Sequence, residues 1–344
     1  MSDSYNITSA YIEITDKCNA KCPFCYDNSH SSNCNILPFP SIQRLVENLD
    51  KNLKLITISG GEPFLHPDIT KIIDFVLNNK LQCSVISNGT AISKDFLKTH
   101  QNELFTLHLS IHSFCSEKHD FVTGVKGSYE KVFNIVEYIY NNDLIINVEL
   151  NFLVTAQNYN ELRIIKNNRL VQMADKVNIH FITFSGREIA FDYLLSDKNI
   201  DKVCSELCKN HLDKNEKCSL PRLTSICKYA TDDETVTVGP RVDAKGFVYP
   251  CTQFFDEKFI VGNIFYNTLE EIFSGEKMVD FREKMRTWIN GNEKCSSCFA
   301  RKVCKGGCPA KGYLQKGNHN EDIMCGQRMK YFITKLRKME TGLR

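Results

Sequence analysis

The stretch AYIEITDKCNAKCPFCY, residues 10–26, begins as an alternating run and ends in three closely spaced thiols. Residues 10–15 alternate apolar and polar side chains with the period of two that is typical of a β-strand. The thiols that follow belong to Cys18, Cys22 and Cys25. Their spacing of four and then three residues would also suit buried thiols on one face of a helix. Pro23 would disrupt the interior of such a helix, so we expect a loop that folds back around a bound group.

The chemistry of three thiols favours an iron–sulfur cluster as that group. Zinc normally takes four ligands, and the further candidates nearby are His30 and Cys34. A [4Fe–4S] cluster presents four irons, so three cysteines leave one iron without a protein ligand. An open iron is what a cluster that activates a small molecule needs.

Five further apolar, β-rich runs follow, and segments of helical periodicity separate them. The runs span residues 53–59, 81–87, 104–111, 144–154 and 176–184. The helical segments span residues 41–50, 68–79, 93–101, 128–142 and 158–173. Strands that alternate with amphipathic helices favour right-handed βαβ units and a parallel sheet. Six units are too few for a closed eight-stranded barrel, so the sequence predicts an α/β fold, a partial (β/α)6 TIM-like barrel.

Distinctive residues follow these expected strands one after another, where parallel β/α folds place their chemistry. GGEP follows the second strand and SNGT the third. The residues concerned are Gly60, Gly61, Glu62, Pro63, Ser87, Asn88, Ser110, His112, Asn151 and, in the SGR that ends the sixth strand, Arg187. Their shared position predicts an active site at the carboxyl edge of the sheet.

Net charge, apolar stretches and cysteine content indicate which partners, compartment and chemistry to expect. The net charge of +2 gives no electrostatic reason to expect a nucleic acid or a membrane surface as partner. No apolar stretch approaches membrane-spanning length, and the first ten residues lack the regions of a signal peptide, so we expect a cytoplasmic protein. In a reducing compartment, 16 cysteines indicate metal or redox chemistry rather than disulfides.

C-x3-C-x2-C before an aromatic residue, with GGEP after the second strand, resembles the signature of the radical S-adenosylmethionine (SAM) superfamily. The resemblance implies that SAM chelates the open iron through its amino and carboxylate groups. An electron from the cluster then cleaves SAM to methionine and a 5′-deoxyadenosyl radical, which abstracts hydrogen from a substrate.

The resemblance also implies roles for the residues at the strand ends. Gly60 and Gly61 let the backbone approach SAM closely, and Glu62 offers a carboxylate near its ammonium group. By the same resemblance, Ser87 and Asn88 form hydrogen bonds with the ribose hydroxyls of SAM, and Tyr26 lies against its adenine. The expected cofactor-binding set is completed by Pro63, Ser110, Asn151 and Arg187.

One stretch departs from the family pattern. SIHSFCSEKHDFVTGVKG resembles a segment that often reads S-L-D-G and then H-D-x-x-R-G. Here His112 replaces the Asp and Thr123 replaces the Arg. An arginine that would grip the SAM carboxylate is therefore missing there, and Arg187 is the candidate to replace it.

After about residue 190 the βα rhythm stops, and cysteines and polar residues take over. We expect a radical SAM core at residues 1–217 and a second domain at 218–344 that ends in an amphipathic helix near 327–339. The pattern C-x2-C-x5-C-x3-C, with GFVYPC upstream and a later cysteine, resembles the SPASM extension, which carries auxiliary clusters. On spacing alone, a zinc-ribbon domain is the alternative.

The SPASM resemblance implies two auxiliary [4Fe–4S] clusters and assigns their ligands. One set is Cys295, Cys298, Cys304 and Cys325. The other set is Cys227, Cys251 and Cys308, with Cys218 as the fourth ligand and Cys208 as the alternative. Most of the remaining cysteines, among them Cys34, Cys83 and Cys204, are expected to be small buried hydrophobes.

We expect an enzyme that oxidatively modifies a ribosomally made peptide by a thioether or carbon–carbon crosslink, because auxiliary clusters suit removal of an electron. The alternatives are a peptide epimerase, a sulfatase-maturing enzyme that forms formylglycine, and a non-catalytic iron–sulfur or zinc carrier. Cys115, after the fourth strand, is the candidate hydrogen-atom donor of an epimerase; otherwise it is an ordinary buried thiol.

The expected partners follow from this function. They are a peptide or protein substrate and an electron donor of the flavodoxin or ferredoxin type. Only about ten residues precede the first strand, so no fused leader-peptide-binding domain is expected there. Recognition of a leader peptide would then use the barrel, the SPASM domain or a separate leader-peptide-binding protein.

Overall fold

A computed structural model describes most of the chain. The described residues are 4–25, 34–48, 52–182, 192–195, 199–203, 206, 218–219, 227–231, 235–316, 322, 325–326, 328–329 and 332–333. Within them runs a sheet with the strand order β12-β11-β10-β2-β3-β4-β5-β6-β7-β8. Its centre is made of β2 (Ser9–Thr15), β3 (Leu55–Gly60), β4 (Gln82–Ser87), β5 (Phe105–Ile111), β6 (Asn147–Val154) and β7 (Lys176–Phe181), each parallel to the next. The expected partial barrel is thereby confirmed.

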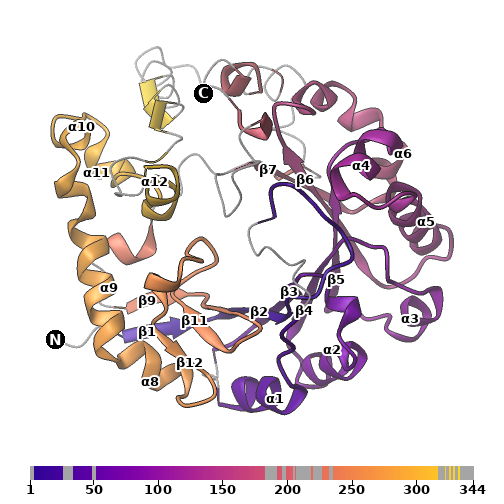
Figure 1. Ribbon diagram of the computed structural model, residues 1–344, viewed down its shortest axis with the longest axis horizontal. Helices are drawn as coiled ribbons and strands as arrows, with labels where there is room; N and C mark the ends of the chain where they lie inside the picture. Colours follow the sequence, from indigo (N-terminus) through magenta and orange to yellow (C-terminus); the bar gives the residue numbers. More distant parts are fainter. Residues whose placement is uncertain are drawn as a thin grey trace.

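Helices cover the convex side of this curved sheet, as Figure 1 shows for α1, α2, α3, α5 and α6. Their bounds are α1 (Phe39–Glu47), α2 (Ile69–Asn78), α3 (Lys94–Thr99), α4 (Ser116–Thr123), α5 (Ser128–Asn141) and α6 (Arg169–Met173). β5 shows the two-sided strand pattern: Phe105, Leu107, Leu109 and Ile111 are fully buried, whereas the residues between them are partly exposed. Burying each such apolar side chain contributes about 1.5–3 kcal/mol, so the helix-covered face is the core and the concave face is left for polar groups.

The segment expected as one helix over residues 158–173 is broken. It consists of two 3-10 turns, η2 (Tyr159–Arg163) and η3 (Ile165–Asn167), followed by the short α6. The side chain of Asn168 accepts a hydrogen bond from the Leu170 N–H and starts a new helix there. An Asn side chain satisfies the free amides of a helix start, so the periodic pattern is cut at that residue.

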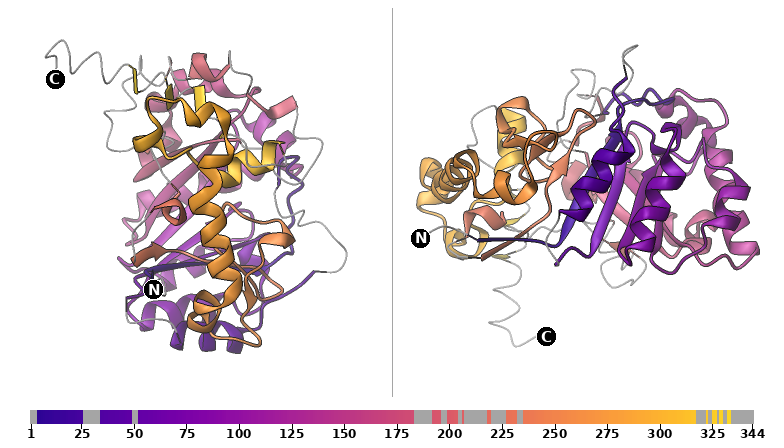
Figure 2. Two further views of the ribbon diagram at one scale, coloured as in Figure 1. Left: turned by 90° about the vertical axis from the view of Figure 1, so that its left-hand side faces the viewer. Right: turned by 90° about the horizontal axis from the view of Figure 1, so that it is seen from below.

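The remaining elements belong to the second half of the chain. They are β8 (Cys218–Ser219), β9 (Thr235–Val238), β10 (Arg241–Val242), β11 (Phe247–Tyr249), β12 (Gly262–Asn263), α8 (Leu269–Ser274), α9 (Glu276–Thr287), α10 (Glu293–Ser296), α11 (Arg301–Cys304) and α12 (Pro309–Lys316). β8 pairs with β7 at the far edge of the sheet. Figure 2 shows the part from β9 onward standing beside the β1–β2 edge of the barrel, with α9 as its long helix. The boundary expected near residue 218 stays a prediction.

The two halves share strands. β1 (Ser4–Ile7) pairs in parallel with β9, and β10 extends the barrel sheet by pairing with β2. Across the second pairing, Arg241 donates to both carboxylate oxygens of Glu13, at 2.8 and 2.7 Å, and both side chains are buried. A bidentate Arg–carboxylate pair fixes both distance and orientation, so this contact sets how the halves meet.

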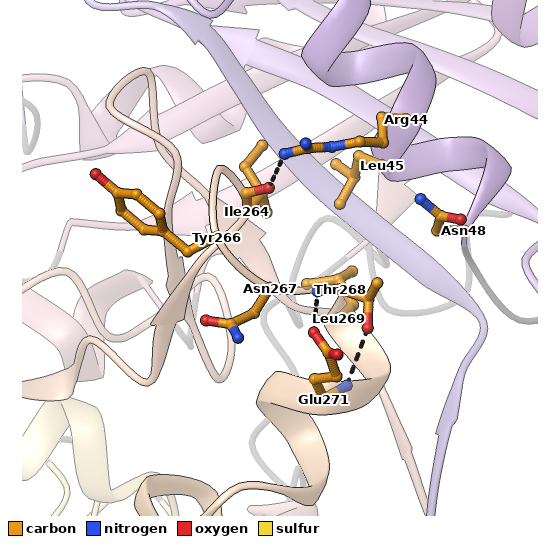
Figure 3. Close-up of a pocket in the computed structure, with 9 residues that line it drawn as sticks. All are labelled: Arg44, Leu45, Asn48, Ile264, Tyr266, Asn267, Thr268, Leu269 and Glu271. Carbon is orange, nitrogen blue, oxygen red and sulfur yellow. Dashed lines mark hydrogen bonds between the residues drawn. The ribbon is translucent and has the colours of Figure 1, made fainter.

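A second contact between the halves lies at α1. The Arg44 guanidinium donates a hydrogen bond to the Ile264 carbonyl, and Figure 3 shows this bond at the edge of a pocket of about 260 Å³. Behind it, Thr268 and Glu271 form a capping box that starts α8. The lining of this pocket comes from the end of α1 and from the segment of residues 264–271, so the pocket lies where the two halves meet.

Candidate active site

The loop that carries the first three cysteines begins against the end of β3. The Gly61 N–H donates to the Thr15 carbonyl at 2.7 Å, and the Glu62 N–H donates to the Lys17 carbonyl at 2.7 Å. A Cβ on Gly60, whose φ is 137°, would lie 2.1 Å from the Thr15 oxygen, and one on Gly61 would lie 2.3 Å from the Lys17 oxygen. Both glycines are therefore needed for close approach of the chain itself to the cysteine loop.

On its other side the loop is held by α4. The Lys21 N–H donates to the Thr123 carbonyl at 2.6 Å. Gly124 ends α4 at a φ of 67°, and a Cβ there would lie 3.2 Å from the Lys21 Cβ. Thr123 stands where the family pattern often has arginine, and its hydroxyl lies 2.8 Å from the Ser128 hydroxyl in the interior. This threonine braces the loop with its backbone.

The Glu62 carboxylate is fully buried and connects the loops after β3 and β4. It accepts hydrogen bonds from the Ser87 hydroxyl at 2.8 Å, the Asn88 N–H at 2.7 Å and the Phe64 N–H at 3.1 Å. Burial raises the pKa of Glu62 from its usual 4.5 to about 7, although the three hydrogen bonds lower it. GGEP and SNGT thus act as one polar unit.

Asn88 connects this unit to the cysteine loop. Its Nδ2 lies 3.9 Å from the Cys18 sulfur and donates to the Asn19 Oδ1 at 2.9 Å. The Ala20 N–H also donates to the Cys18 sulfur, at 3.4 Å. Burial raises the pKa of the Cys18 thiol to about 11, and the Glu62 carboxylate and then Cys25 add to the rise. Donors aimed at a buried sulfur suit a metal-bound thiolate better than a free thiol.

The second cysteine of the loop faces a pair of histidines. The Cys22 sulfur lies 3.8 Å from the His112 Nε2, and the Phe24 ring packs edge-on against His112 with 5.0 Å between ring centroids. The His112 ring stacks on His119 at 5.6 Å. Burial, together with the neighbouring His119, lowers the pKa of His112 to about 3, and burial lowers that of His119 to about 4. Both rings are therefore neutral at neutral pH.

The concave face of the barrel carries a polar row across β5, β6 and β7. Ser110 pairs in register with Asn151, which pairs with Asn178. The Asn178 amide donates to the Asn151 Oδ1 at 3.2 Å and to Glu149 at 2.6 Å, and the His108 Nδ1 lies 3.6 Å from Glu149. Sequence reasoning selected Ser110 and Asn151 but missed the other three. Their signal was the polar residue at each alternate position of the three strands.

In the second half, one group of cysteines lines a cavity of about 250 Å³. The group consists of Cys295, Cys298, Cys304 and Cys325. The pKa of Cys295 is raised by burial and further by the other three thiols. Thiols that raise one another's pKa destabilise one another as thiolates unless a cation holds them.

A further group brings together Cys227, Cys251 and Cys308. Burial, then the other two sulfurs, raises the pKa of Cys227. Burial and Cys308 raise the pKa of Cys251 to about 12. Asp322 connects this group to the preceding one: its Oδ2 accepts from the Cys308 N–H at 2.8 Å and from Arg328 at 2.9 Å.

The donor sets have the chemistry that iron–sulfur clusters require. Among the residues that the structure describes, no three His, Cys, Asp or Glu side chains converge closely enough to hold one metal ion. A zinc ion draws its ligands into one coordination sphere, whereas each cysteine of a [4Fe–4S] cluster binds a different iron. Each of the three cysteine groups supplies at least three thiols, the ligands that a [4Fe–4S] cluster takes.

Some predicted site residues lie outside the described part of the chain. These are Tyr26, Arg187 and Cys208, and Cys204 with them. The backbone of Cys218 lies in β8, paired with β7, but its side chain is not described. Only a few residues of the helix expected near 327–339 are described.

Three further cysteines have clear positions. Cys115 precedes the first residue of α4, and its sulfur donates to the Glu117 carboxylate at 3.0 Å. Cys83 is fully buried, as expected, whereas Cys34 is exposed.

Within the described residues, no helix combines the length and the apolar character that crossing a membrane requires.

Comparison with known proteins places these observations in a family. The model of the radical SAM superfamily matches residues 12–167, and that of an iron–sulfur cluster-binding domain, SPASM, matches residues 239–299. Subtilosin biosynthesis protein AlbA of Bacillus subtilis is 24% identical over 91% of this chain and 70% of its own. A cysteine-type anaerobic sulfatase-maturating enzyme of Clostridium novyi is 23% identical over 94% of both chains.

Solved structures share the fold. SuiB of Streptococcus suis, bound to S-adenosylmethionine, matches with a TM-score of 0.74 at 16% identity, over 92% of this chain and 76% of its own. The enzyme anSMEcpe, with bound AdoMet and a Cp18Cys peptide, matches with a TM-score of 0.73 at 20% identity, over 98% and 99%. The radical SAM domain binds a [4Fe–4S] cluster and SAM, and the SPASM domain binds auxiliary clusters. The chain is therefore an enzyme of the radical SAM superfamily that carries a C-terminal SPASM domain.

Proposed function

We propose that this enzyme oxidatively modifies a ribosomally synthesised peptide by forming a thioether or carbon–carbon crosslink. The observation that carries the proposal is the presence of two separate cysteine groups in the second half, in addition to the loop of Cys18, Cys22 and Cys25. Two extra clusters suit a reaction that removes an electron from its product. The likeness to the subtilosin biosynthesis protein and to a mycofactocin maturase supports a peptide as substrate.

The proposed ligand sets follow the cysteine groups. Cys18, Cys22 and Cys25 hold the SAM-binding cluster. Cys295, Cys298, Cys304 and Cys325 hold one auxiliary cluster. Cys227, Cys251 and Cys308 hold the other, with Cys218 or Cys208 as its fourth ligand. When bound, SAM and the clusters supply a 5′-deoxyadenosyl radical for hydrogen abstraction and acceptors for the electron that an oxidised product leaves behind.

The chain's own residues bind and orient the reactants. Glu62, through Ser87 and Asn88, holds the loop after β4 against the cysteine loop, where SAM would lie. Ser110 and Asn151, which pair in register between β5 and β6, would face the same space from the concave side of the sheet. Glu149 and His108, deeper on that face, offer proton acceptors for a substrate that loses a hydrogen as a proton.

A flavodoxin or ferredoxin-type protein would supply the electron, and a separate leader-peptide-binding protein would present the peptide.

The second candidate function is formylglycine formation in a protein substrate. It is favoured by the match to anSMEcpe, which covers nearly the whole of both chains. Epimerisation with Cys115 as the hydrogen-atom donor ranks lower, because the Cys115 thiol already donates a hydrogen bond to the Glu117 carboxylate.

The test uses anaerobically reconstituted protein with SAM, dithionite and the short peptides encoded beside its gene, in deuterated water. A product two hydrogens lighter, with no deuterium gained at carbon, supports crosslinking. One deuteron gained at an α-carbon would instead identify an epimerase, and conversion of a Cys or Ser to formylglycine would identify the second candidate. Wild-type protein that forms no 5′-deoxyadenosine would overturn the proposal as a whole. The control is the triple variant Cys18→Ala/Cys22→Ala/Cys25→Ala, which should form none.

A further inference from the structure

His112 is held in place from several directions, and its ring points at a cysteine. Its N–H donates to the His119 Nδ1 at 3.2 Å, and its carbonyl accepts from the Asn158 amide at 2.8 Å. The ring lies between Phe24, packed edge-on, and His119, stacked face to face. The Nε2 at the tip of this fixed ring lies 3.8 Å from the Cys22 sulfur.

The chemistry of the Cys22 sulfur determines which tautomer the His112 ring must adopt. A thiolate that binds iron has no proton, so it can only accept a hydrogen bond. The His112 Nε2 must then carry the proton, which leaves Nδ1 as the unprotonated nitrogen. Nδ1 is buried and has no hydrogen-bond partner among the residues that the structure describes, which suits a nitrogen that has no proton to place.

We propose that the His112 Nε2–H donates a hydrogen bond to the Cys22 thiolate and so raises the reduction potential of the SAM-binding cluster. The inference rests on the ligand role given to Cys22 under the proposed function. A donor to a cluster sulfur stabilises the extra negative charge of the reduced state, and hydrogen bonds to sulfur are among the factors that set cluster potentials.

This role explains why a histidine stands at this position. The related stretch often has an aspartate, which has no proton to donate when it is ionised. The imidazole supplies a donor with a rigid reach, and the rings of Phe24 and His119 keep it from turning away. His112 is therefore a positioning residue that acts through Cys22.

The experiment is a redox titration of the fully reconstituted enzyme, followed by electron paramagnetic resonance. The SAM-binding cluster is recognised as the reduced signal that changes when SAM is added. His112→Phe keeps a ring between Phe24 and His119 but removes the donor, so its midpoint potential should be more negative than that of the wild type. His112→Gln places an amide N–H near the position of Nε2 and should restore most of the potential. His112→Asn carries the same amide on a shorter side chain, cannot reach the sulfur, and should behave like His112→Phe.

His100→Phe is the matched control. His100 is also stacked on an aromatic ring, with 4.2 Å to the Phe96 centroid, but it follows α3 at the opposite end of the strands. Its replacement should leave the potential unchanged. Equal potentials in wild type, His112→Phe and His112→Asn would overturn the inference while the proposed function stands. Absence of any SAM-responsive cluster in the wild type would overturn both. If His112→Phe fails to keep its cluster, the comparison of Gln with Asn decides.

Discussion

At the scale of single residues, Glu62 carries a charge that the fold keeps away from water. Its carboxylate organises two loops through three donors, yet burial raises its pKa from 4.5 to about 7. The native state therefore binds this proton more tightly than the unfolded state does. Between pH 4.5 and 7 the native protein binds more protons than the unfolded protein, so the free energy of unfolding falls as pH rises through this range. Above pH 7 this contribution no longer changes with pH.

Glu62→Gln tests this linkage. Relative to the variant, wild-type protein should lose about 3 kcal/mol of unfolding free energy between pH 4.5 and 7, at 1.36 kcal/mol for each unit of pKa shift. Urea denaturation of both proteins under anaerobic conditions, at several pH values across this range, measures the difference. A constant difference across the range would show that the carboxyl group keeps its ordinary pKa.

The cysteines of the first loop should be separable from the other groups. Wild-type protein should bind about twelve irons, four in each of three clusters. Replacing Cys18, Cys22 and Cys25 with Ala should remove about a third of that iron and abolish 5′-deoxyadenosine formation. Iron analysis measures the iron bound by each protein, and chromatography of the products measures the 5′-deoxyadenosine formed. Stoichiometric zinc with little iron in the wild type would contradict the cluster assignment, and equal turnover in both proteins would contradict the assigned loop.

At the scale of elements, the contact between α4 and the cysteine loop depends on a glycine. Gly124→Ala introduces a methyl group at a positive φ and within 3.2 Å of the Lys21 side chain. Gly127→Ala meets the same backbone penalty, at a φ of 78°, but nothing lies within 4 Å of its methyl group. Both variants should lose about 1–2 kcal/mol of stability from the left-handed conformation. Only Gly124→Ala should displace the loop.

The measurement for this pair is the rate at which the cluster loses iron to a chelator. Gly124→Ala should lose the iron of the SAM-binding cluster several-fold faster than Gly127→Ala, while the auxiliary clusters lose theirs at equal rates. Equal loss from the first cluster in the two variants would mean that α4 does not brace the loop.

Sequence patterns predicted the strands well, because the core face of each strand repeats every second residue. They missed α4: SEKHDFVT carries almost no apolar stripe, and the helix depends on contacts of His119 and Thr123 that a local pattern does not contain. The same limit applies to the site. The resemblance to the SPASM extension implied which thiols of the second half belong together, but His112 as a neighbour of Cys22 required the loop after β5 to be placed in space.

At the scale of the whole molecule, the buried pair of Glu13 and Arg241 joins the barrel to the second half. Arg241→Met should cost about 3–5 kcal/mol, because it leaves the Glu13 carboxylate buried without its partner. The double variant Glu13→Leu/Arg241→Met should recover most of this loss, since neither charge then remains. Urea denaturation of the single variants and the double variant, as a double-mutant cycle, gives the coupling. A double variant as unstable as the sum of the single variants would show that the pair is not coupled.

The pairing of β1 with β9 has a consequence for how a ribosome delivers this protein. Ser4 is made long before its partner Thr235, and the outer edge of β2 waits for Arg241 in the same way. Until then the barrel has an open strand edge beside the loop that receives iron, and open edges invite pairing with other chains. Contacts so distant along the chain also close slowly. The nascent enzyme therefore needs shielding during much of its translation, and its edges close only when the chain has left the exit tunnel as far as Val242.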